Sequence, residues 1–582
     1  MPKIELYRNA LDRYVGERLE HDPLEEQLTV AKAEIDEWEN DEGIVKIELN
    51  DTNRPDLWST AGLGRQLRIY RGGKRPSYDF FSTPQSPAET GDRVIAVDPD
   101  LESRRPYVVG FIAQGKEIDE STLADMIQTQ EKLCWNFGQK RKAVAMGIYR
   151  SDLIQFPVQY QAADPDSTRF VPLGESDAEQ SLREIIDNHP KGEEFGHIVS
   201  GFDRMPFLSD ANGDPLSFPP VINSARIGAV ETGDSRVFVE MTGTDHRILM
   251  LSASIVACDL SDAGFDILPV RTEYPYDTPF GRSVVSPLYF QAPVEVDASF
   301  VSRWLGVDFA PQEAVDALAT MGVRAEVVDT EVSEGGSLRV HSPEYRNDFL
   351  HPVDIAEDIM IGHGMQRFEP EALKDFTVGR LTAVEELSRE VKSILVGLGY
   401  QEFVFNYLGS KRDYRERMLA RPLDSNDPID TSDMVRVDNP MSENFEFVRP
   451  SVLPSLLSVE SGSANAVYPH ESFEIGKVAC RDDSDVTGTR TDDMLGLLAS
   501  DADVTFNTIR DQLHVLLYFL NADYHLAESA DERFLPGRRA DVVVGSRAVG
   551  VIGEVHPQIL ENWGVEMPCA ACEIDIRRLL EN

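Results

Sequence analysis

The stretch from Ser342 to Gln366 reads SPEYRNDFLHPVDIAEDIMIGHGMQ, and it decides how the rest of the chain is interpreted. Pro352 suits the first position of a helix, where its missing N–H costs nothing. Gly362 and Gly364 predict where that helix stops. Apolar residues recur at helical spacing between these limits, which predicts one buried face. The residues expected on that face are Val353, Ile355, Ala356, Ile359 and Met360.

Four acidic residues accompany this helix. Asp354, Glu357 and Asp358 stand at i, i+3 and i+4, so we expect them to project together from the side opposite the apolar face. Asp348 lies in the turn just before the helix. Four carboxylates so close together repel one another unless water or a cation lies between them, and Mg²⁺ prefers oxygen ligands of this kind. Spacing alone nevertheless favours a solvated acidic face on an ordinary amphipathic helix.

The composition is that of a large globular protein. The chain has 582 residues, enough for three or four domains, and 41% of them are hydrophobic. No apolar run approaches the roughly 20 residues needed to span a bilayer. The N-terminus lacks the apolar segment of a signal peptide. We therefore expect no membrane partner and a cytoplasmic location.

The formal net charge is −45, which is the wrong sign for a protein that binds phosphate backbones. The acids are spread over the whole length rather than gathered in a tail. We interpret this charge as a surface adapted to a high-salt cytoplasm, where repulsion is screened within about 3 Å at 1 M salt. Net charge therefore does not exclude a nucleic-acid partner.

Five cysteines are too few and too scattered for a disulfide framework. Cys569 and Cys572 form one CxxC pair, but no second pair accompanies it. A structural zinc site needs about four ligands, so zinc is not favoured here.

Several distinctive motifs lie at separate places along the chain. The first is NRPDL at residues 53–57, which forms a turn that leads into a helix. The second pair is PPVINS at 219–224 and EMTGTD at 240–245, for which turn residues joining buried strands are a sufficient structural explanation. In the last 200 residues, an apolar stripe over 381–398 predicts a helix, and the alternation of Phe403, Phe405 and Tyr407 predicts a strand. The C-terminal motifs are NPMS at 439–442, RPSVLP at 449–454, FEIG at 473–476 and GEVHP at 553–557.

These motifs, together with R-x-D and D-x-x-E-D in the opening stretch, resemble the beta subunits of phenylalanyl-tRNA synthetase of the archaeal and eukaryotic type. The resemblance covers nearly the whole chain. It implies that Mg²⁺ is held at the contact with the alpha subunit by Asp348, Asp354, Glu357 and Asp358. The family's Gly-Tyr after this helix is replaced here by Gly362-His363.

The resemblance implies an α+β multidomain fold with four parts. These are an N-terminal α/β domain at 1–90, an editing domain of the tRNA-deacylating type at 92–265, a winged, DNA-binding-like domain carrying the magnesium site at 286–365, and a class II synthetase-like antiparallel core at 376–582.

An editing domain has a physical reason to exist. A hydrophobic pocket built for phenylalanine cannot strongly reject tyrosine, which adds only a hydroxyl, so a second site must hydrolyse tyrosyl-tRNA. Such a site needs hydroxyl and amide groups. The candidates from the two central motifs are Asn223, Ser224, Thr242 and Thr244.

Two absences predict that the C-terminal core does not catalyse aminoacylation. A class II ATP site clamps the α-phosphate with the arginine of an F-R-x-E motif, and the sequence has no F-R-x-E. Glu416-Arg417 and Glu532-Arg533 lack the glycine run that precedes such a pair. Because bidentate clamping of phosphate requires the arginine itself, we expect the ATP site on the alpha subunit.

We therefore expect the beta subunit of an α₂β₂ phenylalanine–tRNA ligase that acts on tRNA(Phe) with ATP. The chain is too short for the bacterial form with its extra domains, which predicts the archaeal type, from a halophile. Two alternatives stay open. One is a free-standing hydrolase that clears mischarged tRNA, and the other is a non-enzymatic tRNA-binding or assembly protein.

Overall fold

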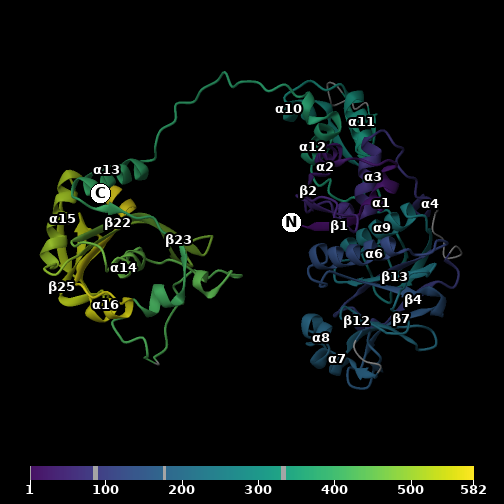
Figure 1. The fold of residues 1–582 in the computed structure, drawn as a ribbon, viewed down its shortest axis with the longest axis horizontal. Helices are drawn as coiled ribbons and strands as arrows, with labels where there is room; N and C mark the ends of the chain where they lie inside the picture. Colours follow the sequence, from purple (N-terminus) through teal and green to yellow (C-terminus); the bar gives the residue numbers. More distant parts are fainter. Residues whose placement is uncertain (1, 83–89, 175–177, 329–335, 426, 582) are drawn as a thin grey trace. The chain divides into compact units, whose positions relative to one another are not determined.

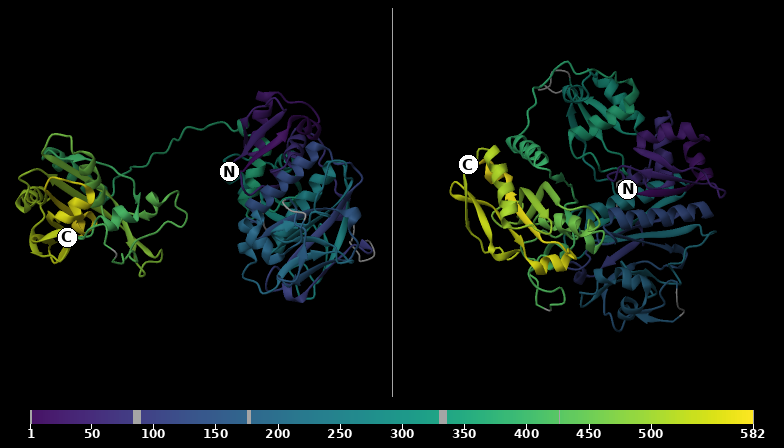
Figure 2. Two further views of the ribbon diagram at one scale, coloured as in Figure 1. Left: turned by 60° about the horizontal axis from the view of Figure 1, so that its bottom comes forward. Right: turned by 60° about the vertical axis from the view of Figure 1, so that its left-hand side comes forward.

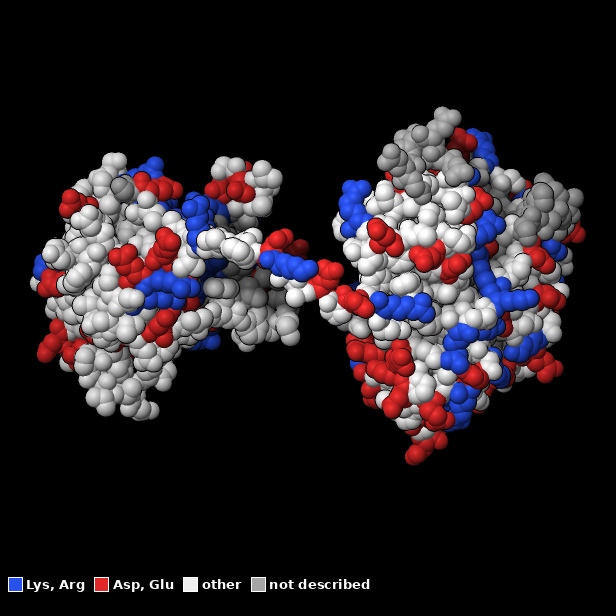
Figure 3. Space-filling model, turned by 90° about the horizontal axis from the view of Figure 1, so that it is seen from above, with Lys and Arg blue, Asp and Glu red and all other residues white. Residues whose placement is uncertain are grey.

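The computed structural model describes residues 2–82, 90–174, 178–328, 336–425 and 427–581. The chain forms two compact units, Met1–Glu371 and Ala372–Asn582 (Figures 1 and 2). Acidic side chains are scattered over both units on the face seen in Figure 3, with Lys and Arg between them. In the part of the chain that the structure describes, no helix has the length and apolar character needed to cross a membrane.

The first unit begins with a small three-stranded sheet in the order β1-β3-β2. Burial alternates strictly along β3, as expected for a strand with one face on a core. Helix α2 ends at Leu28, and the chain then forms β2. The elements are β1 (Lys3–Tyr7), α1 (Arg8–Val15), α2 (His21–Leu28), β2 (Ala33–Glu37), β3 (Ile44–Leu49), α3 (Thr60–Tyr70) and α4 (Asp79–Ser82).

A ten-stranded sheet forms the middle of this unit, in the order β12-β11-β10-β7-β4-β14-β5-β13-β6 with β15 beside β14. Its strands are β4 (Val94–Val97), β5 (Tyr107–Gln114), β6 (Val144–Arg150), β7 (Val158–Ala163), β10 (Met205–Ser209), β11 (Pro215–Phe218), β12 (Ile222–Asn223), β13 (Arg236–Gly243), β14 (Asp266–Glu273) and β15 (Ser283–Ser286). Arg169–Phe170 (β8) and Gln180–Ser181 (β9) form a separate short pair.

Helix α9 (His246–Asp262) packs on β5 and on α3, so it is covered from both sides. This explains why its sequence is apolar nearly all round. Helix α6 (Glu120–Lys132) lies between the N-terminal sheet and β13 in Figure 1, and it continues as one π-helical turn at Leu133–Phe137. Two short helices, α7 (Leu182–Asn188) and α8 (Pro190–Phe195), follow β9.

The opening stretch belongs to a third layer of the first unit, in which a sheet of order β16-β18-β17 is flanked by three helices. Pro352 is the first residue of α12, and Gly364 follows its last residue with a φ of +99°, as predicted. Gly362 instead lies inside the helix, where an added Cβ would stand 2.1 Å from the carbonyl oxygen of Ala317 on α11. The elements are β16 (Val294–Asp297), α10 (Ala298–Leu305), α11 (Pro311–Thr320), β17 (Arg324–Val328), β18 (Ser337–His341) and α12 (Pro352–His363).

The expected apolar face of α12 is only partly right. Ile355, Ala356 and Ile359 are buried, but Val353 is exposed. Asp358 is buried as well, so the buried face of α12 includes a position that was expected on the acidic side.

The second unit has a seven-stranded sheet of order β19-β22-β23-β27-β26-β25-β24, antiparallel except for β19 beside β22. Alternate residues of the strands feed two apolar cores, Leu497 on one face and Leu498 on the other. The strands are β19 (Gln401–Glu402), β22 (His470–Arg481), β23 (Thr489–Ser500), β24 (Tyr524–Glu528), β25 (Phe534–Val544), β26 (Arg547–Val555) and β27 (Cys569–Asp575), with a separate pair β20 (Leu408–Gly409) and β21 (Phe447–Val448).

Helices cover both faces of this sheet. One face carries α13 (Ala383–Gly397), α15 (Phe506–Phe519) and α17 (Ile576–Leu580), and the other carries α14 (Leu453–Gly462) and α16 (Pro557–Trp563). The expected strand through Phe403, Phe405 and Tyr407 is wrong. Strand β19 ends at Glu402, and the alternating rings pack on one another and on Arg449 rather than in the sheet.

Candidate functional site

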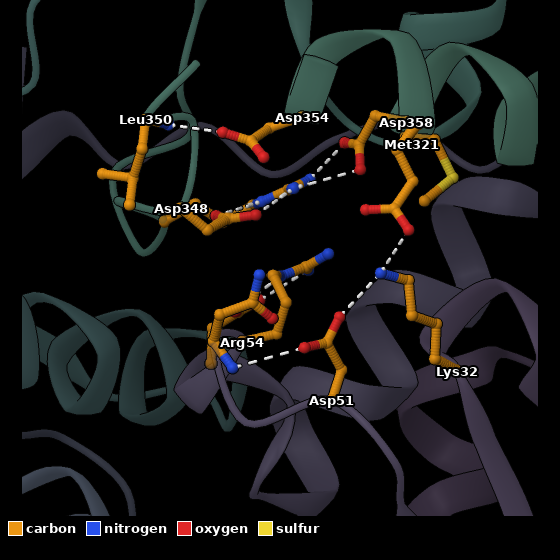
Figure 4. Close-up of polar contacts among 12 residues, drawn as sticks. Lys32, Asp51, Arg54, Met321, Asp348, Leu350, Asp354 and Asp358 are labelled. Carbon is orange, nitrogen blue, oxygen red and sulfur yellow. Dashed lines mark hydrogen bonds and ion pairs between the residues drawn. The ribbon is translucent and has the colours of Figure 1, made fainter. Parts of the chain in front are cut away.

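The four acids of the opening stretch line one small cavity of about 20 Å³ in the first unit. Basic residues lie among them, as Figure 4 shows. Lys32, Asp51 and Arg54 come from the N-terminal segment, whereas Arg346 comes from the turn before α12. The cluster therefore joins two parts of the first unit that are far apart in the sequence.

Arg346 is the centre of this arrangement, with only 1% of its side chain exposed. Its Nε and Nη2 donate to the two oxygens of Asp348 at 3.0 and 2.6 Å. Its Nη1 and Nη2 donate to the two oxygens of Asp358 at 2.6 and 3.2 Å. Burial alone would raise the pKa of Asp348, but Arg346 and, more weakly, Arg54 lower it to about 2. One guanidinium thus binds both carboxylates, and it holds that of Asp348 ionised.

The other two acids are bound differently. Oδ2 of Asp354 accepts hydrogen bonds from the backbone N–H groups of Leu350 and His351 at 2.8 and 2.7 Å, which fixes the start of α12. Oε1 of Glu357 is 2.8 Å from Nζ of Lys32, which also binds Asp51 at 2.7 Å. One oxygen of each acid is left without a hydrogen bond to any residue the structure describes.

The expectation that the three helix acids project together away from the core is therefore wrong for Asp358, which is buried. Cations from the chain itself relieve the repulsion among the acids. Within the described ranges, no group of three or more His, Cys, Asp or Glu residues is arranged to hold a metal ion. Sequence reasoning missed Arg346 and Lys32 as partners, although Arg346 stands two residues before Asp348.

A second candidate site is a cavity of about 480 Å³ beside β6, β12 and β13. Its wall is mainly apolar, with Met146, Ile148 and Val221 among its lining residues. The PPVINS motif supplies part of this wall. Arg141 binds the motif, donating from Nη1 to the carbonyl oxygens of Pro220 and Val221 at 3.0 and 3.1 Å.

The structure brings two of the four editing candidates into this cavity. Asn223 and Thr242 line it, but Ser224 and Thr244 do not. Ser224, the last residue of the PPVINS motif, is buried. The hydroxyl of Thr244 donates to the carbonyl oxygen of Lys142 at 3.3 Å and lies after the end of β13.

The polar end of the cavity is formed by Glu240, Tyr149 and Ser217. The Tyr149 hydroxyl is 2.8 Å from Oε2 of Glu240 and 2.9 Å from Oγ of Ser217. Oε1 of Glu240 is buried and has no hydrogen-bond partner among the described residues. Burial raises the pKa of Glu240 to about 8, with Tyr149 and Arg105 acting in the opposite direction.

Sequence reasoning missed this carboxyl, although the signal was present. Residues two apart on a strand share a face, so a cavity lined by Thr242 should also be lined by Glu240. Thr242 itself is oriented by Arg105, whose Nε donates to the threonine hydroxyl at 2.9 Å.

Two family models match the second half of the chain. Residues 294–365 match the model of the tRNA synthetase B5 domain, and residues 373–576 match that of the phenylalanyl tRNA synthetase beta chain CLM domain. A phenylalanine–tRNA ligase beta subunit of Borrelia hermsii is 44% identical over 580 residues, covering 100% of both chains. One from Borreliella afzelii is 43% identical over 584 residues, again covering 100% of both.

The chain belongs to the family of phenylalanine–tRNA ligase beta subunits. It is a component of a ligase of the aminoacyl-tRNA synthetase class, and a beta subunit implies a second kind of subunit. An N-terminal fragment of a phenylalanyl-tRNA synthetase beta subunit from Pyrococcus horikoshii is similar in structure, with a TM-score of 0.56 and 32% identity. It matches 62% of this chain and 100% of the fragment.

The bacterial relatives correct one step of the sequence argument. This chain matches Borrelia beta subunits along their whole length, so a short chain does not exclude a bacterial beta subunit. These relatives also give no support to a halophilic archaeal source.

Proposed function

We propose that this beta subunit assembles with an alpha subunit as α₂β₂, helps to attach phenylalanine to tRNA(Phe) in the cytoplasm, and hydrolyses mischarged tyrosyl-tRNA in the cavity around Glu240. ATP is then used at the alpha subunit. The unpaired, buried Oε1 of Glu240 at the end of an apolar cavity is the observation that carries the editing proposal.

The cavity suits a tyrosine side chain better than a phenylalanine one. An aromatic ring would lie against the apolar wall, and a para-hydroxyl would reach Glu240 and Ser217. A phenylalanine ring would leave Oε1 of Glu240 unpaired, which is costly because a buried polar group without a partner loses its hydration. Sites built to bind a hydroxyl in this way reject the analogue lacking it by factors of about 10⁴–10⁵.

The C-terminal core supports the division of labour between the subunits. Arg533 follows Glu532 in the sequence, but its guanidinium already binds Asp531 at 2.7 Å and Glu573 at 2.8 Å. Arg449 is fully buried and binds Glu474 at 2.7 Å. Both arginines are therefore occupied within the fold rather than presented to a phosphate.

The purified chain alone is expected not to activate phenylalanine. ATP–pyrophosphate exchange should be absent without the alpha subunit and appear when it is added. Under the same conditions the assembled ligase should deacylate tyrosyl-tRNA and spare phenylalanyl-tRNA. Exchange by this chain alone would contradict the assignment of ATP to the partner, and equal hydrolysis of both tRNAs would contradict the editing proposal.

Mg²⁺ remains a proposal for the four-acid cluster in the assembled ligase. The donors fit this ion in chemistry, because all four are carboxylates. They do not fit it in arrangement within the isolated chain, since Arg346 and Lys32 occupy the space between them. We therefore assign the metal to the complex, where the partner would complete the site.

Assembly is expected to depend on Mg²⁺ through Glu357. Replacing Glu357 with Gln should weaken metal-dependent α–β affinity by about 10–100-fold, the range typical of losses around a metal site. Asp51→Asn is the matched control, because Asp51 binds the same Lys32 but is not one of the four acids. Affinity would be measured with Mg²⁺ and with EDTA. If EDTA leaves the wild-type affinity unchanged, the cluster is purely structural.

The two alternatives predict different behaviour. A free-standing hydrolase would deacylate tyrosyl-tRNA without forming a complex, and an assembly protein would form the complex without deacylation.

The archaeal type is supported by the likeness of the Pyrococcus fragment, which matches 62% of this chain at 32% identity. The division into domains at 1–90, 92–265, 286–365 and 376–582 is likewise a proposal, and limited proteolysis would test its boundaries.

A further inference from the structure

A groove of about 1060 Å³ runs beside the Glu240 cavity in the first unit. The two hollows share Arg141 and Lys191 in their walls, so the groove leads to the cavity. Among its lining side chains are Lys132, Trp135, Phe137 and Phe195. They come from the end of α6, the π-helical turn that follows it, and α8.

The sequence around this groove reverses the charge of the rest of the chain. From Lys132 to Ser151 there are five basic residues and no acidic one, in a protein with 101 acids. Four of only 13 lysines lie between Lys132 and Lys191. Two acids also line the groove, Glu131 and Glu194, and Glu194 is paired with Lys191 at 2.9 Å.

The basic loop after the π-helical turn is held in an unusual conformation. Gln139, Lys140 and Arg141 have φ values of +52°, +54° and +68°, three left-handed residues in succession without a glycine. Such strained backbone persists only where the surroundings enforce it, and it concentrates at functional sites. Here the loop is fixed by Arg141, which binds the PPVINS motif and lies 4.0 Å from the Phe195 ring.

An aromatic platform stands beside these charges. Trp135 is 47% exposed, which is high for the largest apolar side chain. The ammonium of Lys140 is 5.5 Å from its ring centroid, and the edge of Phe195 packs against it. A basic groove lined by exposed aromatic rings is the arrangement that binds single-stranded nucleic acid, with phosphates on the cations and bases on the rings.

We propose that this groove binds the single-stranded 3′ end of an aminoacylated RNA, with a base stacked on Trp135 and the backbone on Lys140 and Lys191. Arg141 then marks the point where the strand's last nucleotide and its aminoacyl group pass into the Glu240 cavity. This proposal rests on the editing function proposed above, because it names how the substrate reaches that cavity.

The test uses the ligase assembled from both subunits, with tyrosyl-tRNA as substrate and a short single-stranded RNA ending in CCA as the binding probe. Trp135→Ala should raise the KM for tyrosyl-tRNA hydrolysis by about tenfold and leave kcat near the wild-type value, since one base stack is lost. Lys140→Asn removes one charge, and asparagine tolerates the left-handed backbone. It should lower the slope of log affinity against log salt by about 0.7 for the RNA probe.

Lys140 belongs to the site through its contact with the Trp135 ring. Trp304→Ala and Lys74→Ala serve as matched controls, because both side chains are exposed, neither lines the groove, and the structure gives neither a contact with Trp135. Binding of the RNA by both groove variants with wild-type affinity and salt dependence would overturn the proposal. A ligase that binds the RNA through Trp135 but never deacylates tyrosyl-tRNA would support the groove and reject the editing function. Normal deacylation with unchanged KM in both groove variants would support the editing function and reject the groove.

Discussion

Replacing Arg346 with Met is expected to destabilise the first unit by about 3–5 kcal/mol, the usual cost of breaking a buried ion pair from one side. The change leaves the carboxylates of Asp348 and Asp358 buried without their shared cation. Lys32→Met is the control, because Lys32 is 35% exposed and its partner Glu357 is 44% exposed. That pair should contribute about 1 kcal/mol or less. Urea unfolding of each variant would measure the difference.

The pH dependence of this loss provides a second check. Arg346 holds the pKa of Asp348 at about 2, below the unfolded value, so its stabilising contribution is present above the unfolded pKa and is lost as pH falls through about 2. Without Arg346, burial would raise the pKa of Asp348, and the variant would gain stability on acidification. The difference in the free energy of unfolding between wild type and variant should therefore become smaller below about pH 4. A gap that is constant with pH would show that the loss arises from packing rather than charge.

Adding Mg²⁺ to the same unfolding experiment tests whether the four acids can bind a metal ion or serve only as partners of the basic side chains. If the acids alone can hold a divalent ion, the Arg346→Met variant should recover stability as Mg²⁺ is raised, because a ligand that binds only the folded state stabilises it. Recovery by Mg²⁺ but not by an equal ionic strength of Na⁺ would show that Arg346 stands where a metal could bind.

How far the sequence predicts this molecule depends on the range of the interaction. The start of α12 at Pro352 and its end before Gly364 follow from local backbone rules, and both are confirmed. The side on which Asp358 lies does not follow from such rules. Helical spacing gives the angles between side chains but not which partner covers them, and here the partner of Asp358 is an arginine from the preceding turn.

Prediction of the cavity from the sequence meets the same limit, because local rules do not show which side chains are buried together. The sequence motifs predicted that residues near Asn223 and Thr242 come together, and in the structure both line one cavity. Thr244 is only two residues from Thr242, but β13 ends at Gly243 and the alternation of faces ends with it. Glu240 lies on the same face as Thr242, and its significance comes from burial, which a single sequence does not display.

Replacing Glu240 with Ala is expected to reduce the preference of the ligase for hydrolysing tyrosyl-tRNA over phenylalanyl-tRNA by at least about 10²-fold. A site selects a hydroxyl because its own buried polar group is unpaired without it, so removing that group removes the penalty on phenylalanine. Hydrolysis of both aminoacyl-tRNAs would be measured as kcat/KM. Glu240→Gln keeps a hydrogen-bonding group and should retain part of the preference.

Two further variants locate the chemistry inside the cavity. Asn223→Ala should slow tyrosyl-tRNA hydrolysis at least about tenfold, as expected when one good hydrogen bond to a reacting group is lost. The sequence made Thr244 a candidate for the same pocket, but its hydroxyl binds Lys142 outside the cavity, so Thr244→Ala should behave as wild type. The pH profile adds a separate readout. Since the pKa of Glu240 is raised to about 8, wild-type kcat/KM should rise through that pH as the ionised carboxylate accepts the tyrosine hydroxyl more strongly, and Glu240→Gln should abolish the rise. A Glu240→Ala enzyme with undiminished preference and an unchanged profile would place tyrosine recognition elsewhere in the first unit.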